Sequence, residues 1–307
     1  MNKAQMLAAL GTEQVNERSR HLDEMDALEI VRLMNEVNAD VIKAVDEALE
    51  QIACAIEAIV ERMKRGGRLI YMGAGTSGRL GVIDAAECPP TFGVSAELIQ
   101  GIIAGGDGAL RTAVEGAEDS AELGRHDLMA KALTERDAVI AVSASGYAPY
   151  CVGALQYAAS VGALGISLSC NKGANTSNYA SIAIEAPTGA EVLSGSTRLK
   201  AGTATKMILN MISTGTMVRM GKVYKNLMVD VRATNVKLKD RSIRIAMNAL
   251  DVDRESAEQV LSAAGGSIKT AIVMYEGGVS CEEADRLLAE NEGYVRRAIR
   301  AAGGENV

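Results

Sequence analysis

Three turns in the sequence combine glycine with serine or threonine in a way that could hold a phosphate group. They are Gly75-Thr-Ser-Gly78, Ser143-Ala-Ser-Gly146 and the longer run from Ser194 to Thr203. At the start of a helix, such a turn offers free backbone N–H groups, the positive end of the helix dipole and short hydroxyl donors. Ser and Thr also cap helices for structural reasons alone, so one turn would carry little weight. Three turns favour a phosphate-binding site.

The turns fit a phosphosugar better than a nucleotide. No GxxxxGK[ST] motif is present, which excludes a nucleotide P-loop. Gly73, Gly75 and Gly78 match the dinucleotide fingerprint GxGxxG. That fingerprint also needs an acidic residue at the end of the next strand, where only Asp107 follows, beyond a glycine pair. We therefore predict that the turns bind the phosphate of a sugar.

A carboxyl group close to the first turn is a candidate proton donor. Glu87 lies two residues before Pro89, and proline disfavours helical backbone at the residue that precedes it. The helix that begins near Gly78 is therefore predicted to end at about Glu87, where the helix dipole disfavours negative charge. If that carboxyl group is also partly removed from water, it keeps its proton closer to neutral pH and suits general acid catalysis. The alternative is a solvated glutamate at a helix end.

A second acidic cluster follows the next predicted strand. Glu115, Glu118, Asp119 and Glu122 have the spacing i, i+3, i+4 and i+7 on a helix predicted for residues 108–123. Such a stripe is usually a solvated face, but this helix follows the strand that neighbours the first one, so one acid could face the cleft. Spacing alone does not choose between Glu115 and Glu118. Two acids across a phosphosugar pocket would suit proton abstraction beside a carbonyl and protonation of a leaving group.

An alternation of strands and helices must position these turns and acids. Helices are predicted over residues 28–63 and 199–220 and between successive strands. The pattern predicts an α/β fold with a doubly wound, mostly parallel sheet flanked by helices, in which ligands bind at the carboxyl ends of the strands. The predicted strands cover residues 68–72, 98–104, 137–142, 163–169 and 181–185.

The character of the sequence changes near residue 248. Amphipathic helices are predicted over residues 253–263, 267–274 and 281–302, with no strand between them. We therefore predict two parts. Residues 1–247 form the sugar-phosphate-binding catalytic domain with N-terminal helices, and residues 248–307 form a small helical C-terminal subdomain.

Composition and charge argue against several classes of function. The net charge is −7 and no run of Lys or Arg stands out, unlike in nucleic-acid-binding proteins. No apolar run reaches the roughly 18 residues that suggest a membrane span, and the N-terminus lacks a signal-peptide pattern. The five Cys residues are never in CxxC spacing and the two His residues are isolated, so neither a disulfide framework nor a metal site is expected. These features predict a cytoplasmic protein that uses no cofactor and no membrane or nucleic-acid partner.

Six segments of the sequence resemble those of the N-acetylmuramic acid 6-phosphate etherases. The segments keep the order that they have in that family, and the likeness extends from about Thr12 to Ala302. Departures are minor, such as Thr197-Arg-Leu where relatives often have Ser-Arg-Met, and they remove no hydroxyl or charge that the mechanism requires. The resemblance implies a sugar isomerase (SIS) fold followed by a small helical region. The segments are residues 73–81, 86–91, 115–119, 195–204, 222–230 and 233–238.

The resemblance also implies an activity and a set of site residues. Enzymes of this family cleave the D-lactyl ether of N-acetylmuramic acid 6-phosphate, giving N-acetylglucosamine 6-phosphate and D-lactate. The family is described as homodimeric and as acting in cell-wall sugar recycling, by elimination then hydration, without metal or organic cofactor. Its proton-donating glutamate falls on Glu87, and its second catalytic glutamate falls on Glu118. The implied phosphate ligands are Thr76, Ser77, Ser143 and Ser145, with Ser196 and Lys200 as further candidates.

The implied chemistry agrees with the residues. Opening the sugar ring exposes an aldehyde at carbon 1, which acidifies the proton on carbon 2. Glu118 would remove that proton, and Glu87 would protonate the lactate oxygen that leaves carbon 3. An aldose–ketose isomerase would also need a glutamate base, but no acid aimed at carbon 3. A non-catalytic sugar-phosphate sensor would tolerate loss of the glutamates, and a transcriptional regulator would add a basic helix-turn-helix segment that the N-terminus does not supply.

Overall fold

The computed structural model describes residues 8–231 and 236–304, so the first three residues of the segment that begins at residue 233 lie outside the described residues. The chain divides into two compact units, which are described separately. The first comprises Met1–Ala86 and Ala96–Ser213, and the second comprises Glu87–Ser95 and Thr214–Val307. The boundary predicted at residue 248 falls inside the second unit, and it stays a prediction.

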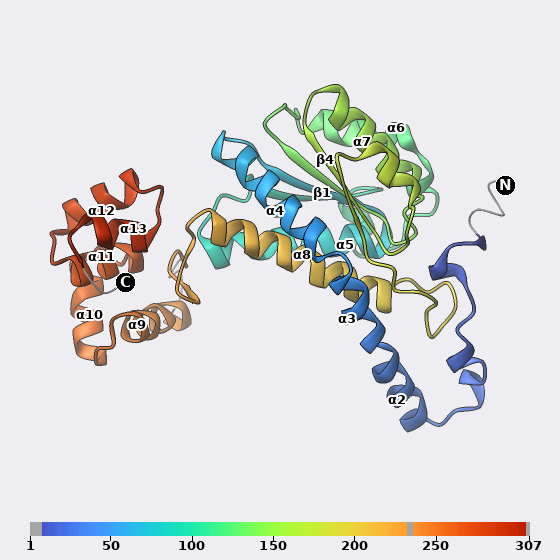
Figure 1. Ribbon diagram of the computed structural model, residues 1–307, viewed down its shortest axis with the longest axis horizontal. Coiled ribbons are helices and arrows are strands. Elements are labelled where there is room, and N and C mark those ends of the chain that lie inside the picture. Colours follow the sequence, from blue (N-terminus) through green and yellow to red (C-terminus); the bar gives the residue numbers. More distant parts are fainter. Residues whose placement is uncertain (1–7, 232–235, 305–307) are drawn as a thin grey trace. The chain divides into compact units, whose positions relative to one another are not determined.

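The first unit is built on a parallel sheet that has five strands in the described residues, in the order β2-β1-β3-β4-β5 (Figure 1). The residues of β1, β3 and β4 are all buried, which explains their continuous apolar runs. This confirms the predicted α/β fold with a parallel sheet. The strand order reverses between β1 and β3, because β2 pairs with the outer side of β1. The strands are β1 (Leu69–Gly73), β2 (Ile99–Ile103), β3 (Ala138–Val142), β4 (Leu164–Ser169) and β5 (Ile182–Glu185).

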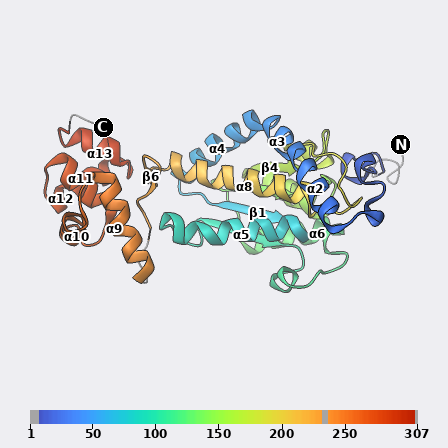
Figure 2. The same cartoon turned by 90° about the horizontal axis from the view of Figure 1, so that it is seen from below.

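Helices cover both faces of this sheet (Figures 1 and 2). On one face, α6 (Ala121–Ala130) packs against α7 (Pro149–Ser160), and α7 contacts β3 and β4. On the other face, α4 (Leu49–Lys64) contacts β4 and β5. The α6–α7 contact requires glycine, because a Cβ atom at Gly153 would lie 1.9 Å from the carbonyl oxygen of Ala121. Close helix packing therefore holds the loops at the carboxyl edge of the sheet.

The single helix predicted over residues 28–63 is interrupted. The structure has α2 (Ala27–Val37) and α3 (Ala39–Asp46) before α4, with short breaks between them. Only Val37 of α2 is buried, whereas Leu28 and Val31 are 54% and 57% exposed. Two large apolar side chains of α2 are therefore more than half exposed in the single chain.

Helix α5 (Gly75–Phe92) continues past Glu87, where the sequence predicted its end. That prediction was wrong, because proline only disfavours helical backbone at the preceding residue, and its own fixed φ is compatible with a helix. Pro89 and Pro90 both lie inside α5. The helix ends at Gly93, which has a φ of 65° and donates its N–H to the carbonyl of Pro89 at 3.0 Å. Glu87 is an exposed residue inside a helix rather than at its end.

The segment between β2 and α6 is mostly irregular, so the helix predicted over residues 108–123 was wrong. It contains two short 3-10 turns, η4 (Asp107–Leu110) and η5 (Ala117–Asp119). Gly116 has a φ of 73°, which interrupts any helical path between them. The four acids therefore do not share one helical face. Glu118 belongs to η5, and Glu115 lies in the loop before it.

The second unit contains a set of helices around its own apolar core. The helical C-terminal region is confirmed, but α9 and a short antiparallel β6–β7 pair before it were not predicted. The segment that begins at Lys222 forms part of this unit, where the Asp230 carboxylate lies 3.3 Å from the Lys222 ammonium and 2.6 Å from that of Lys269. The elements are β6 (Val223–Tyr224), β7 (Leu227–Met228), α9 (Val236–Leu250), α10 (Arg254–Ala263), α11 (Ile268–Gly277), α12 (Cys281–Glu290) and α13 (Val295–Ala301).

Two kinds of feature are not found in residues 8–231 and 236–304. No helix in these ranges has both the length and the apolar character needed to cross a membrane. Nor do these ranges bring three or more His, Cys, Asp or Glu side chains together in a way that could hold a metal ion.

Candidate functional site

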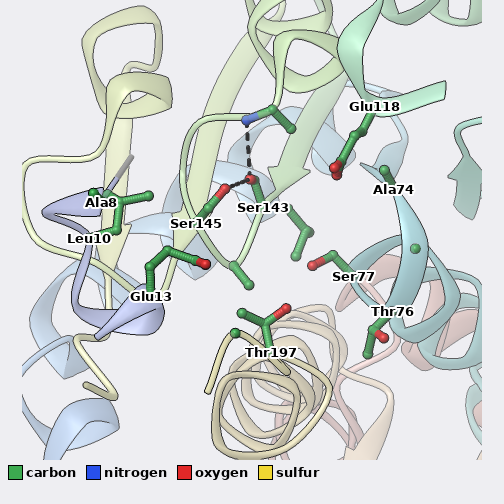
Figure 3. A pocket seen from close by; sticks show the side chains of 15 residues that line it. Ala8, Leu10, Glu13, Ala74, Thr76, Ser77, Glu118, Ser143, Ser145 and Thr197 are labelled. Atoms are coloured by element: carbon green, nitrogen blue, oxygen red, sulfur yellow. Dashed lines mark hydrogen bonds between the residues drawn. The ribbon is translucent and has the colours of Figure 1, made fainter. Parts of the chain in front are cut away.

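A cavity of about 460 Å³ opens at the carboxyl edge of β1 and β3 (Figure 3). The two strands flank the point where the strand order reverses, which is where open α/β sheets bind ligands. Thr76, Ser77, Ser143, Ser145 and Glu118 all line this cavity. The structure therefore brings together five of the side chains that the sequence singled out, from three separate loops.

The turn after β1 supplies the first wall. Thr76 and Ser77 lie in the first turn of α5, where backbone N–H groups have no partner within the helix. Gly78 lets the helix start directly against the strand, because a Cβ atom there would lie 2.4 Å from the carbonyl oxygen of Gly73. The close approach aims the helix N-terminus and two hydroxyls at the cavity, which suits an anion.

The turn after β3 supplies a pair of hydroxyls. The Oγ atoms of Ser143 and Ser145 lie 3.3 Å apart. The N–H of Gly146 donates to Ser143 Oγ at 3.1 Å, and the N–H of Tyr147 donates to Ser145 Oγ at 3.2 Å. The backbone fills an acceptor position of each hydroxyl, and one hydroxyl donates to the other, so the pair has one proton left to direct towards a ligand.

The third Ser/Thr cluster contributes Thr197 to the cavity lining, but neither Ser196 nor Lys200. The Lys200 side chain is only 3% exposed. Its ammonium donates to the carbonyl oxygen of Thr188 at 2.7 Å and lies 3.4 Å from the Asp40 carboxylate. Sequence position suggested a phosphate ligand, whereas the structure shows a lysine that is occupied by internal partners.

The start of α8 (Lys200–Arg219) is closed by a buried carboxylate. Glu191 accepts hydrogen bonds from the N–H groups of Lys200 and Ala201, both at 2.9 Å, and is fully buried. A negative charge at this end of a helix is favourable. This helix start is therefore already satisfied within the chain, unlike that of α5, and its role at the site is to fix the segment that carries Thr197.

A segment near the N-terminus forms a wall that the sequence analysis missed. Glu13 lines the cavity and its carboxylate points inward (Figure 3). The neighbouring Thr12 is buried and exchanges two hydrogen bonds with Asn171, at 3.3 Å and 3.1 Å. Asn171 also donates to the carbonyl oxygens of Ala144 and Ser145, at 3.1 Å and 3.3 Å. One amide thus joins the N-terminal segment to the turn after β3.

Glu118 enters the cavity from η5 (Figure 3), and its side chain is exposed. Behind the turn after β3 lies the buried thiol of Cys151, whose Sγ atom is 3.4 Å from the carbonyl oxygen of Val142. Burial, and to a smaller extent the negative charge of Glu118, raise the pKa of Cys151 to about 12. The thiol near the site is therefore protonated and unreactive.

A smaller cavity of about 180 Å³ adjoins the first. Ala74, Gly75 and Glu118 line both cavities. Arg79 lines the smaller one and is held by two backbone carbonyls. Its Nε donates to Leu110 at 3.1 Å and its Nη2 donates to Ala109 at 2.7 Å. The guanidinium therefore ties the irregular segment after β2 to α5.

Glu87 is not among the residues that line these cavities. It belongs to the second unit, and its side chain is exposed on α5. Its predicted role as a proton donor depended on a helix end and on burial. In the single chain, Glu87 has neither.

Comparison with known proteins identifies the family. The model of the glucokinase regulatory protein N-terminal SIS domain matches residues 51–159, and that of the SIS domain matches residues 114–214. An N-acetylmuramic acid 6-phosphate etherase of Geobacillus sp. (strain WCH70) is 54% identical over 295 residues, covering 96% of this chain and 100% of the relative. Proteins of the same name from Mycolicibacterium smegmatis and Halalkalibacterium halodurans are 52% and 53% identical, each covering 96% of this chain and 99% of the relative. The resemblance seen in the motifs is thereby confirmed, and the chain belongs to the N-acetylmuramic acid 6-phosphate etherase family.

Proposed function

We propose that the chain cleaves the D-lactyl ether of N-acetylmuramic acid 6-phosphate, releasing N-acetylglucosamine 6-phosphate and D-lactate. As a member of its family, the chain is an enzyme, a carbon–oxygen lyase. The observation that supports this substrate most directly is the cavity in which the hydroxyls of two strand-end turns share a lining with Glu118. An anion site beside a carboxylate base suits a phosphosugar that carries an acidic proton on its reacting carbon.

The 6-phosphate would lie against the start of α5 and the turn after β3. Thr76, Ser77 and the pair of Ser143 and Ser145 would donate hydrogen bonds to it, and the N–H groups of the first helical turn would add to them. In this proposal the phosphate dianion is held by neutral hydroxyl and backbone N–H donors. Lys200 would support the site from within the fold, because its ammonium is engaged by Thr188 and Asp40.

The proposed reaction uses two glutamates and water. In the open-chain sugar, Glu118 takes the proton from carbon 2, and the electron pair forms a double bond between carbons 2 and 3. The bond between carbon 3 and the lactyl oxygen breaks, and Glu87 gives its proton to that oxygen. Water then adds at carbon 3 while a proton returns to carbon 2. Because Glu87 lines neither cavity of the single chain, its role rests on the family resemblance and is tested by the Glu87→Gln variant.

We also propose that the enzyme is a cytoplasmic homodimer that serves the recycling of cell-wall sugars. Support for the dimer comes from α2, on which Leu28 and Val31 are separated by three positions and are more than half exposed. Two neighbouring exposed apolar side chains on one helix suit a contact with another protein surface. The face of α2 is therefore the proposed contact between two copies of the chain.

The reaction is tested by incubating the protein with N-acetylmuramic acid 6-phosphate in isotopically labelled water. Elimination followed by hydration predicts D-lactate release, solvent oxygen at carbon 3 and solvent hydrogen at carbon 2 of the product. Mass spectrometry and NMR of the product measure both labels. Lactate release with the original oxygen kept on carbon 3 would contradict the mechanism. Binding of the phosphosugar with no lactate release would indicate a sensor instead.

A further inference from the structure

The smaller cavity beside Glu118 has a composition different from that of the larger one. Glu118 stands at the boundary, because it lines both. The larger cavity presents the hydroxyls of the strand-end turns, whereas the smaller one, of about 180 Å³, is lined largely by small apolar side chains. Its size and lining suit a small organic group with a methyl substituent. The apolar lining residues are Ala74, Ala104, Ala109, Ala113, Val114 and Ala117.

Arg79 gives this cavity an oriented cation. Its hydrogen bonds to the carbonyl oxygens of Ala109 and Leu110 use two of the five N–H groups of the guanidinium. The side chain is half-buried, and both acceptors lie on one segment, so the guanidinium is fixed in direction. A planar guanidinium with N–H groups remaining suits two-point recognition of a carboxylate.

We infer that the smaller cavity receives the D-lactyl group of the substrate and that Arg79 binds its carboxylate. The inference rests on the proposed function. The substrate has two anionic groups, the 6-phosphate and the lactyl carboxylate. If the strand-end turns hold the phosphate and Glu118 meets carbon 2, then carbon 3 and its ether oxygen, which are one and two bonds from carbon 2, lie close to Glu118 at the boundary between the cavities. The lactyl methyl then meets the alanines, and the carboxylate meets Arg79.

Two carboxylates line the same cavity and oppose a bound anion. Glu115 and Glu118 are exposed, so water and salt screen their charges, whereas Arg79 is half-buried and held in place. Glu118 also becomes neutral when it takes the proton from carbon 2. The repulsion between Glu118 and the lactyl carboxylate therefore falls as the carbon–oxygen bond breaks, and Arg79 retains the attraction.

The inference is tested with two substrates, N-acetylmuramic acid 6-phosphate and its lactamide, in which a neutral amide replaces the lactyl carboxylate. We expect wild-type enzyme to favour the acid in kcat/KM by about tenfold or more, as for a hydrogen-bonded charge pair. In Arg79→Met the ratio between the two substrates should fall close to one, and Arg79→Lys should keep part of it. The ratio isolates recognition of the carboxylate from any loosening of the segment after β2, which would lower both rates together. An unchanged ratio in Arg79→Met would overturn the inference.

The matched control is Arg111→Met, which removes a cation from the segment after β2 that Arg79 contacts, but not from the cavity lining. It should leave the ratio unchanged, and an equal fall in this variant would overturn the assignment to Arg79.

A second experiment measures product inhibition of the wild-type enzyme, so it does not depend on the folding of a variant. D-lactate should inhibit in the presence of N-acetylglucosamine 6-phosphate at least tenfold more strongly than D-lactamide, and equal inhibition would count against the site. Lactate release from neither substrate would overturn the proposed function and with it the inference, whereas release without preference for the acid would overturn the inference alone.

Discussion

Ser143 and Ser145 show how single residues prepare the larger cavity for an anion. Backbone N–H groups of Gly146 and Tyr147 occupy an acceptor position of each hydroxyl. Since one hydroxyl donates to the other, the pair keeps one hydroxyl proton for a ligand, and the turn itself contributes no charged side chain. Proton transfer falls to the carboxyl groups, which the proposed mechanism divides between a base and an acid.

Two conservative substitutions test which glutamate acts as the base and which as the acid. Glu118→Gln keeps the size of the side chain and removes the base, so exchange of the carbon 2 proton and lactate release should both fall by about 100-fold or more. Glu87→Gln should abolish lactate release. Binding of N-acetylglucosamine 6-phosphate, measured by calorimetry, should change little in either variant because the hydroxyls of the turns are intact.

Glu122→Gln is the control for this pair, since Glu122 belongs to the same acidic cluster of the sequence but lines neither the larger nor the smaller cavity. It should retain most of the wild-type rate. Loss of phosphosugar binding in Glu87→Gln would make Glu87 a structural residue. Normal proton exchange in Glu118→Gln would assign the base to another group.

The residues that could be predicted from the sequence are those that follow strands directly. Thr76 and Ser145 lie in turns whose place at the carboxyl edge follows from the alternation of strands and helices. Glu13 could not be predicted in this way, because its position depends on the hydrogen bonds between Thr12 and Asn171, which are 159 positions apart. No local sequence pattern indicates a contact between residues that are so far apart along the chain.

At the scale of elements, β1 and β3 are joined at the edge opposite the cavity by a buried ion pair. Asp137, which precedes β3, accepts hydrogen bonds from the Arg68 guanidinium at 2.8 Å and 3.1 Å. It also accepts from the backbone N–H groups of Arg68 and Thr134, at 2.8 Å and 2.9 Å. The Asp137 side chain is only 2% exposed. These bonds fix the relative register of the two strands that carry the site.

Asp137→Asn should destabilise the protein by about 2 kcal/mol at pH 7, as expected for hydrogen bonds to a charged group. Burial alone would raise the pKa of Asp137, but the hydrogen bonds and charge of Arg68 and the N–H of Thr134 outweigh it and hold the pKa below its usual value. The carboxylate therefore stabilises the fold above its unfolded-state pKa of about 4, and this contribution is lost as the pH falls below that value. Urea unfolding of both proteins between pH 7 and pH 3 measures the difference. A difference in stability that does not shrink with falling pH would contradict this account.

The continuously apolar strands and the longest helix were predicted well, and the elements that depend on backbone exceptions were not. The buried strands β1 and β3 and the long helix α8 were found within a residue or two of their bounds. The end of α5 was predicted wrongly because proline disfavours helical backbone at the preceding residue but does not exclude it. The helix predicted before α6 failed because its acidic spacing was compatible with a helix, while Gly116 adopted a left-handed backbone that helices exclude.

At the scale of the whole molecule, the proposed homodimer can be tested through α2. Leu28→Glu combined with Val31→Glu places two like charges on the exposed apolar face, so a dimer formed there should weaken by about tenfold or more in Kd. Analytical ultracentrifugation across a range of protein concentrations measures the change. Met129→Glu on α6 is the control, since it also charges an exposed apolar residue but on a different helix. A monomeric wild-type protein would rule out the dimer, and a dimer unaffected by the α2 changes would place the contact elsewhere.

The protonated thiol behind the turn after β3 has a consequence for chemical labelling. Cys151 and Cys170 are buried, and burial raises the pKa of each to about 12, so neither forms the thiolate that maleimides and iodoacetamides attack. Cys88 is buried as well, whereas Cys54 is exposed on α4 and Cys281 is partly accessible. A fluorescent dye added in limiting amount should therefore attach first at Cys54, away from the strand-end turns. The unaltered protein thus offers its own attachment point for an optical reporter, without a substitution near the site.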